Sequence, residues 1–358
     1  MTVTARSDRA IFQRKDNINE EDKVDVISKP RWQVWDKCLC GFASDEIPPQ
    51  FREVFIISGY RKPYISAVNC IRSLAYPSNE SVNVWSHFIP FALFIIQFSV
   101  LFSSFSPFDS FVYPLLSFAI GICGFLLMSS GAHCFNSMSP RIRHICFFFD
   151  YAAISVYCVG AGQAFLFYTR PINSRITFLN SSFLFLAISV LISVMSTYTC
   201  CASRHRWSKF KYVIRTGSFA IAFFFNSSPY LYRFLTGVEF NPNSVAVSYF
   251  KRHCVFYFIA ALANMTRIPE RWMPGSFDFI GHSHHFLHLF TAMGAGDQFT
   301  AIHMEMKSRM DLIQKSDILP TFFNSLGLMI LVLIIDLSIV AYFGINLKSD
   351  KEEEHKVL

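Results

Sequence analysis

Long apolar runs are the feature that most constrains the fold of this chain. Eight stretches come close to the roughly twenty mostly apolar residues that an α-helix needs to cross the hydrocarbon core of a membrane. A backbone inside lipid must satisfy its own hydrogen bonds, so these stretches predict transmembrane helices. They lie near residues 84–105, 111–134, 146–168, 176–199, 213–234, 253–269, 280–298 and 319–345.

The composition supports a membrane protein with several spans. Of the 358 residues, 52% are hydrophobic and only 16% are charged, and the mean hydropathy is +0.34. The net charge of +7 is modest and concerns loops and anionic lipid headgroups, so it does not suggest a nucleic-acid partner. Most of the ten cysteines fall inside apolar runs, where they act as small packing residues and not as a disulfide framework.

The connections between most of these runs are short, which predicts an all-α membrane protein with sequence neighbours packed side by side. We expect a seven-helix transmembrane bundle over residues 83–306, then a connector, an additional eighth C-terminal helix and a polar tail over 307–358. Residues 46–82 carry aromatic and apolar side chains interrupted by prolines, which favours a collar at the membrane surface. Residues 1–45 are polar and charged, which predicts a disordered segment without a cleavable signal peptide.

The charges beside the spans indicate the orientation. Lysines and arginines in the connections are equally numerous on the two sides, so the loops alone give no direction. Arg61, Lys62 and Arg72 lie just ahead of the first span and tip the balance toward a cytoplasmic N-terminus.

A histidine octet, residues 281–288, carries the strongest chemical signal. Its four histidines stand at the start of an apolar run, where each buried imidazole needs a hydrogen-bond partner or a metal ion. His284 and His288 are four residues apart and share one helical face. His285 with His288, and His282 with His285, are three residues apart, so the spacing alone leaves the metal-binding pair open.

The expected topology brings further polar residues to the level of the octet. Ser129 and His133 end the second span, Asp150 begins the third, and His284 and His288 begin the seventh, so all five lie toward the N-terminal side. Three histidines at one level suit zinc, with Asp150 as a ligand, a partner through water or an orienting group. The alternative is that each is a separate structural residue bonded to backbone carbonyls, which their shared depth argues against.

Glu80, Asn83 and His87 gather at the start of the first span, on the same side of the membrane. We interpret them as residues that cap and pack the beginning of that helix.

Several short motifs follow one another along most of the chain from about residue 47 to residue 306. Each alone is weak, but their order is specific. They are Ser-Gly-Tyr-Arg at 58–61, the stretch 66–74, Asn-Glu-Ser-Val-Asn-Val-Trp-Ser-His at 79–87, Ser129-x-x-x-His133, Asp150 seventeen residues after His133, and Arg-Ile-Pro-Glu-Arg at 267–271 leading into the octet.

Together these motifs resemble the progestin and adipoQ receptor family, and residues 58–61, 150–153 and 280–284 resemble its membrane progestin receptor branch. The resemblance implies a zinc ion held by His133, His284 and His288. The Ser-His-x-x-x-His pattern of the family falls on residues 283–288 and so selects His284 and His288. At His285 relatives commonly have glutamine, so this histidine receives no role.

The resemblance also implies two alternative functions. The first is a plasma-membrane receptor for a lipophilic small molecule, a progestin-like steroid, that enters from membrane lipid and signals through a G protein. The second is a zinc-dependent, ceramidase-like hydrolase of a sphingolipid amide, in which Ser129 and Asp150 are the catalytic residues that orient or deprotonate water. In the receptor, the metal is mainly structural.

Overall fold

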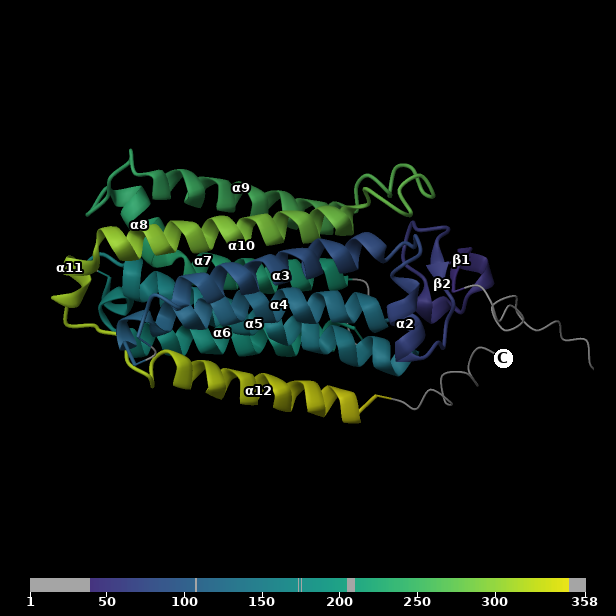
Figure 1. Cartoon of the computed structure of the whole chain (residues 1–358), viewed down its shortest axis with the longest axis horizontal. Helices are drawn as coiled ribbons and strands as arrows, with labels where there is room; N and C mark the ends of the chain where they lie inside the picture. Colours follow the sequence, from purple (N-terminus) through teal and green to yellow (C-terminus); the bar gives the residue numbers. More distant parts are fainter. Residues whose placement is uncertain (1–38, 107, 173, 175, 205–209, 348–358) are drawn as a thin grey trace, which may run out of the picture.

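The computed structural model describes residues 39–106, 108–172, 174, 176–204 and 210–347. Long helices run side by side along one axis, and a two-stranded antiparallel sheet lies with α2 at one end (Figure 1). The protein is therefore an all-α membrane protein, as predicted. Its strands are β1 (Cys40–Phe42) and β2 (Tyr60–Arg61), and its helices are α2 (Ala67–Ser73), α3 (Ser81–Phe102), α4 (Tyr113–Phe135), α5 (Pro140–Thr169), α6 (Ser182–Ser203), α7 (Lys211–Asn226), α8 (Ser228–Thr236), α9 (Val245–Thr266), α10 (Ser283–Ser308), α11 (Met310–Gln314) and α12 (Leu326–Ile345).

The predicted spans correspond to helices, with one correction. Within the described ranges, six helices are long and apolar enough to cross a membrane, namely α3, α4, α5, α6, α9 and α12. The segment 213–234, expected as one continuous span, forms two helices instead, α7 and α8, that meet at Ser227. Pro229 at the start of α8 has no amide hydrogen to continue the helix before it. Helix α10 is the most polar of the long helices, so the count of seven spans plus one stays a prediction.

Residues 1–38, most of the segment expected to be disordered, lie outside the described residues, as does the polar tail over 348–358.

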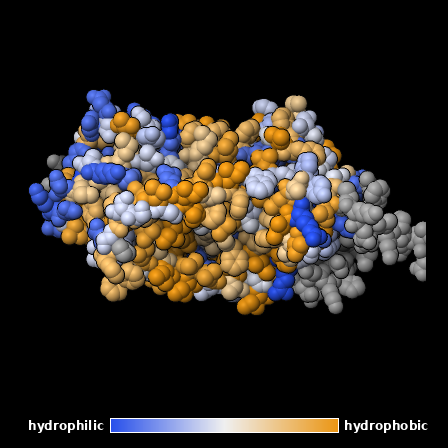
Figure 2. Space-filling view, viewed as in Figure 1, coloured by the Kyte–Doolittle hydropathy of each residue, from blue (hydrophilic) through white to orange (hydrophobic). Residues whose placement is uncertain are grey.

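The surface has the polarity that a membrane requires. Figure 2 shows hydrophobic residues over the middle of the bundle and hydrophilic ones toward its two ends. Large apolar side chains are exposed along the outer helices, among them Leu93, Ile96, Phe258, Ile330 and Ile334. Such a surface is unfavourable in water and favourable against lipid tails, which identifies an integral membrane protein.

Helices α4 and α5 approach closely. A Cβ atom on Gly160 would lie 2.8 Å from the carbonyl oxygen of Ser117, and one on Gly121 would lie 2.8 Å from the Cα atom of Tyr157. Glycine permits this backbone contact, as at other tightly packed membrane helices. The contact holds the N-terminal half of α4 against the C-terminal half of α5, and the candidate residues lie in the opposite halves of the same two helices.

The segment before α3 packs onto one end of the bundle. Arg61 of β2 is buried and donates hydrogen bonds to the carbonyl oxygens of His133 and Cys134 in the last turn of α4. Those carbonyls have no partner within the helix, so Arg61 caps α4. Asp278, just ahead of α10, accepts hydrogen bonds from the backbone nitrogen (2.6 Å) and the hydroxyl (2.7 Å) of Ser58. This segment therefore ties together the two helix ends that carry the histidines.

Candidate metal centre

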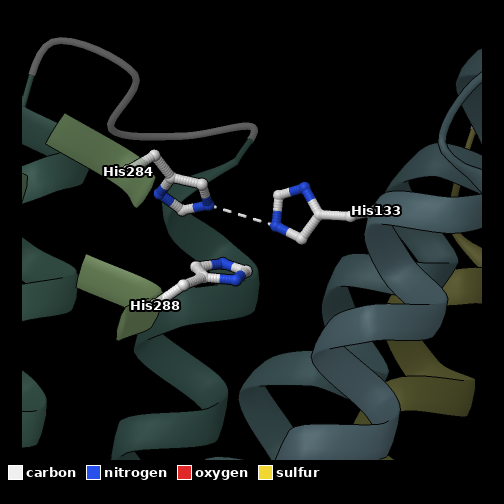
Figure 3. A group of neighbouring side chains, drawn as sticks. All are labelled: His133, His284 and His288. Atoms are coloured by element: carbon white, nitrogen blue, oxygen red, sulfur yellow. Dashed lines mark hydrogen bonds between the residues drawn. The ribbon is translucent and has the colours of Figure 1, made fainter. Parts of the chain in front are cut away.

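Three histidines from two helices meet at this end of the bundle. His133 comes from α4, and His284 and His288 come from α10, with their rings turned toward one another (Figure 3). Their candidate ligand atoms all lie within 4.8 Å of one another. The Nε2 atoms of His133 and His284 are 3.1 Å apart. Three imidazole nitrogens at one point are a ligand set that can hold a divalent metal ion.

Hydrogen bonds on the outer side of the rings decide which nitrogens face the centre. His133 donates its Nδ1 proton to the Glu80 carboxylate at 2.7 Å. His288 donates its Nδ1 proton to the carbonyl oxygen of Asn83 at 3.0 Å. In a neutral imidazole the other nitrogen then carries a lone pair, so the Nε2 atoms of both rings are acceptors. Lone pairs that converge in this way fit a cation.

Glu80 orients the centre, and the interpretation of this residue as a helix cap is wrong. The start of α3 has no side-chain cap hydrogen bond. The Glu80 carboxylate instead accepts hydrogen bonds from His133, from Asn83 at 2.8 Å and from Asn136 at 2.6 Å. Burial opposes its ionisation, but the His133 ring and the Arg61 guanidinium hold the pKa of Glu80 well below its usual range. A charged carboxylate behind a ligating histidine fixes the ring and increases its basicity.

Asn83 and His87, which also lie at the start of α3, both contact His288. Asn83 supplies the carbonyl that receives the His288 proton, and the His87 ring stacks on the His288 ring with centroids 3.9 Å apart. Packing was expected for His87, whereas the contact with His288 was not. The sequence feature that could have indicated this contact is depth in the membrane, because residues 80–87 begin a span on the same side as the end of α4.

Ser129 and Asp150 adjoin the histidines without completing the metal group. Ser129 and Asp150 are both buried and line the same cavity as the histidines. In the part of the chain that the structure describes, Asp150 Oδ1 has no hydrogen-bond partner. Among the same residues, only the three histidines are close enough together to share one metal ion. Of the three roles open to Asp150, this geometry favours an indirect one.

All five residues selected from the sequence line one cavity. Its volume is about 990 Å³, and it runs from the histidines into the apolar interior of the bundle. Its apolar walls include Phe125, Ile154, Phe223, Leu231 and Leu287.

The two remaining histidines of the octet have structural contacts. His282 is the N-cap of α10 and accepts a hydrogen bond from the backbone nitrogen of His284. The His285 ring lies on the His282 ring with centroids 3.5 Å apart and accepts a hydrogen bond from the Gly281 nitrogen. Neither belongs to the group that can share an ion.

Comparison with known proteins gives the same relatives as the motifs. A family model described as "Haemolysin-III related" matches residues 75–299. The chain is 33% identical over 320 residues to membrane progestin receptor gamma of Homo sapiens, covering 88% of this chain and 96% of that protein. It is 35% identical over 270 residues to membrane progestin receptor delta of Mus musculus, covering 74% and 78%. The chain belongs to the progestin and adipoQ receptor family. The range matched by the family model contains Glu80, Asp150 and the three histidines of the centre.

Proposed function

We propose that this chain is a plasma-membrane receptor for a lipophilic ligand, a progestin-like steroid, with a zinc ion inside the helical bundle. The observation that carries the proposal is the cavity of about 990 Å³, which joins an apolar interior to the histidine centre. Pockets of roughly 300–1,000 Å³ with apolar walls and a few polar groups are typical of small-molecule sites. Relatives named membrane progestin receptors supply the steroid class.

Zinc would be held by His133, His284 and His288. The donor set supports it, because neutral imidazoles backed by a carboxylate and a carbonyl are a common arrangement at zinc. The ion would join α4 to α10 at the end of the cavity. A shift of these helices on ligand binding would then reach the collar, residues 46–82, through Arg61. With the N-terminus in the cytoplasm, that collar is the surface that would contact a G protein.

Steroid binding and metal content are tested on the same purified protein. Ala220 lines the cavity and Ala92 is exposed on the outer surface of α3, so tryptophan at each gives a matched pair of variants. We expect Ala220→Trp to lose progesterone binding, because the indole fills the cavity, and to keep one zinc per chain by elemental analysis. Ala92→Trp should keep both. Unchanged steroid affinity in Ala220→Trp would place the ligand elsewhere and contradict the receptor site.

A second candidate function is a ceramidase-like amide hydrolase. The observation that favours it is Asp150, a buried carboxylate that lines the cavity beside the histidines with one unpartnered oxygen. A zinc ion at the centre would supply Lewis acidity for attack of water on an amide. Asp150 would accept the proton of the attacking water and return it to the leaving amine, while Ser129 would hold the carboxylate in place.

The two candidates separate in a ceramide assay. If the protein is a hydrolase, purified protein releases fatty acid, and Asp150→Asn abolishes the release while zinc content stays at wild type. If wild-type protein with full zinc binds steroid but releases no fatty acid, the hydrolase is excluded and the receptor stands.

A further inference from the structure

Six cations surround the cavity on the side of the collar. They are Arg52, Arg143, Arg204, Lys211, Arg215 and Arg267. Two of them have carboxylate partners, since Arg143 pairs with Glu53 and Arg267 pairs with Glu270. Within the described residues, Arg204, Lys211 and Arg215 form no salt bridge. Three carboxylates, those of Glu53, Glu80 and Asp150, line the same cavity, and Asp150 interacts with the charges of Arg204 and Arg215. The six cations outnumber these carboxylates, so the cavity wall carries an excess of positive charge.

Two tyrosines bring these cations together in pairs. Arg204 donates a hydrogen bond to the Tyr151 hydroxyl at 3.1 Å, and the Arg215 guanidinium lies over the Tyr151 ring at 5.0 Å from its centroid. Lys211 and Arg267 each lie 5.0 Å from the centroid of the Tyr212 ring. Aromatic rings hold cations by their faces without neutralising them.

The guanidinium groups keep donors that no described residue uses. Arg215 donates through Nε to the Ser203 hydroxyl, and Arg204 donates through Nε to His144 and through Nη1 to Tyr151. Among the described residues, the remaining guanidinium N–H groups of Arg204 and Arg215 have no hydrogen-bond acceptor, and both side chains are half-buried in the cavity wall. Like charges held together in a partly buried wall are unfavourable unless an anion joins them.

We propose that this cluster of Arg204, Lys211 and Arg215 binds the phosphate of an amphiphilic lipid whose apolar body occupies the cavity. Paired guanidinium groups bind phosphate oxygens in bidentate fashion, and a dianion satisfies three cations better than a singly charged carboxylate does. The continuous cavity supplies the apolar part of the site. The inference rests on the proposed ligand cavity, but it needs neither the steroid nor the metal.

Three probes with the same alkyl chain test the headgroup. Hexadecyl phosphate, hexadecanoate and hexadecan-1-ol are titrated against the full-length protein in detergent, and binding is measured by native mass spectrometry. We expect the phosphate to bind at least about tenfold more tightly than the alcohol, because charge-assisted hydrogen bonds form to the phosphate alone of those two. Equal affinity for the carboxylate would overturn the assignment to phosphate. Competition by inorganic phosphate at the same concentration would overturn the assignment to a lipid.

Substitutions place the headgroup on the cluster. Arg204→Gln with Arg215→Gln should lower the affinity for hexadecyl phosphate about tenfold or more and leave that for hexadecan-1-ol unchanged. Arg215→Lys keeps the charge without the paired donors, and a smaller loss is expected there. Arg72→Gln removes an exposed cation of α2 and should change nothing. Zinc content and progesterone binding are measured on each sample. If both persist while hexadecyl phosphate binds the double variant as tightly as wild type, the phosphate site is wrong and the proposed function remains.

Discussion

Both ends of the bundle bury charged and polar groups, but the two ends differ in how completely these groups are paired. At the end opposite the collar, Arg233 pairs with Glu305 at 2.6 Å and Arg309 pairs with Glu239 at 2.5 Å. The same guanidinium groups donate to the carbonyl oxygens of residues 168–170, where α5 ends. Each of these four charged side chains has a partner of opposite charge, and none of the four lines the cavity of about 990 Å³.

At the histidine end, the groups are arranged around a space. Lone pairs of His133 and His288 converge on one point, and three cations of the cavity wall form no salt bridge within the described residues. A buried cluster that stabilises a fold tends to pair within itself, because an unpaired buried charge is unfavourable. Imidazole lone pairs that converge on one point, and cations that lack salt-bridge partners, indicate a binding site. The comparison therefore separates a structural cluster from a functional one by how completely its members are paired.

The largest effect should come from removing a histidine of the centre. We expect His284→Ala to reduce bound zinc from one per chain to near zero, because ligation of structural zinc contributes on the order of 10 kcal/mol in small zinc domains. Elemental analysis of purified protein measures the result.

His285→Ala is the matched control, one residue further along the same helix. It should keep zinc, because the His285 ring contacts His282 and not the centre. Equal zinc content in the two variants would contradict the choice of His284, and no zinc in folded wild-type protein would remove the metal from the centre altogether.

At the opposite end, the expected effect is on stability. Glu305→Ala leaves the Arg233 guanidinium buried without its carboxylate, which should cost about 3–5 kcal/mol of unfolding free energy. Denaturation in detergent measures the change.

The pair of substitutions Arg233→Met with Glu305→Leu should recover much of that loss, since it removes both charges together. Zinc content should stay at one per chain in every folded variant. A loss of zinc would show that the two ends are not independent.

The sequence predicted the parts of this comparison that depend on where the long helices lie and on the depth of each residue in the membrane. Apolar runs predicted the long helices, and the alternating direction of the spans placed Ser129, His133 and Asp150 near the start of α10, as the cavity lining has them. Spacing brought His284 and His288 to one face, while the choice of that pair required the family resemblance.

Other parts depend on contacts between side chains that are distant in sequence. Glu80 was interpreted as a cap because the local sequence places it at the start of α3. The local sequence does not show that the His133 ring lies against its carboxylate. The division of the fifth span at Ser227 required weighing Pro229 against an otherwise apolar run. The cationic cluster was not predicted from the sequence, because Arg204 and Arg215 come together around Tyr151, which lies on another helix.

A smaller effect is expected from the carboxylate that supports the centre. Glu80→Gln keeps the shape of the side chain but removes its charge, so His133 becomes a weaker ligand. Zinc affinity should fall about 10- to 100-fold, as for other residues that orient a metal ligand. Competition with a zinc-chelating dye measures it. Asn136→Asp, which replaces the amide that donates to Glu80 with a second carboxylate, should disturb the same network. Asp45→Asn, at an exposed position just ahead of the collar, should have no effect. Unchanged zinc affinity in Glu80→Gln would return Glu80 to a purely structural role.

The smallest effect concerns Glu53, which forms a salt bridge with Arg143 at the histidine end. Burial opposes ionisation of Glu53, but Arg143 and Arg267 outweigh it and lower its pKa from 4.5. A lowered folded-state pKa means that the pair stabilises the protein above about pH 4.5 and that this stability is lost as the pH falls through the folded-state value. With 34% of the Glu53 side chain accessible, solvent screening limits the effect to less than about 1 kcal/mol.

Denaturation of wild type and Glu53→Gln over a range of pH tests this contact. The variant should be less stable at pH 7, and the difference should disappear on acidification, because the wild-type carboxyl is then neutral as well. Asp45→Asn, at an exposed position just ahead of the collar, should follow wild type at every pH. If Glu53→Gln is as stable as wild type at pH 7, the pair adds nothing to folding, and Arg143 is then as available for binding as the cations that form no salt bridge.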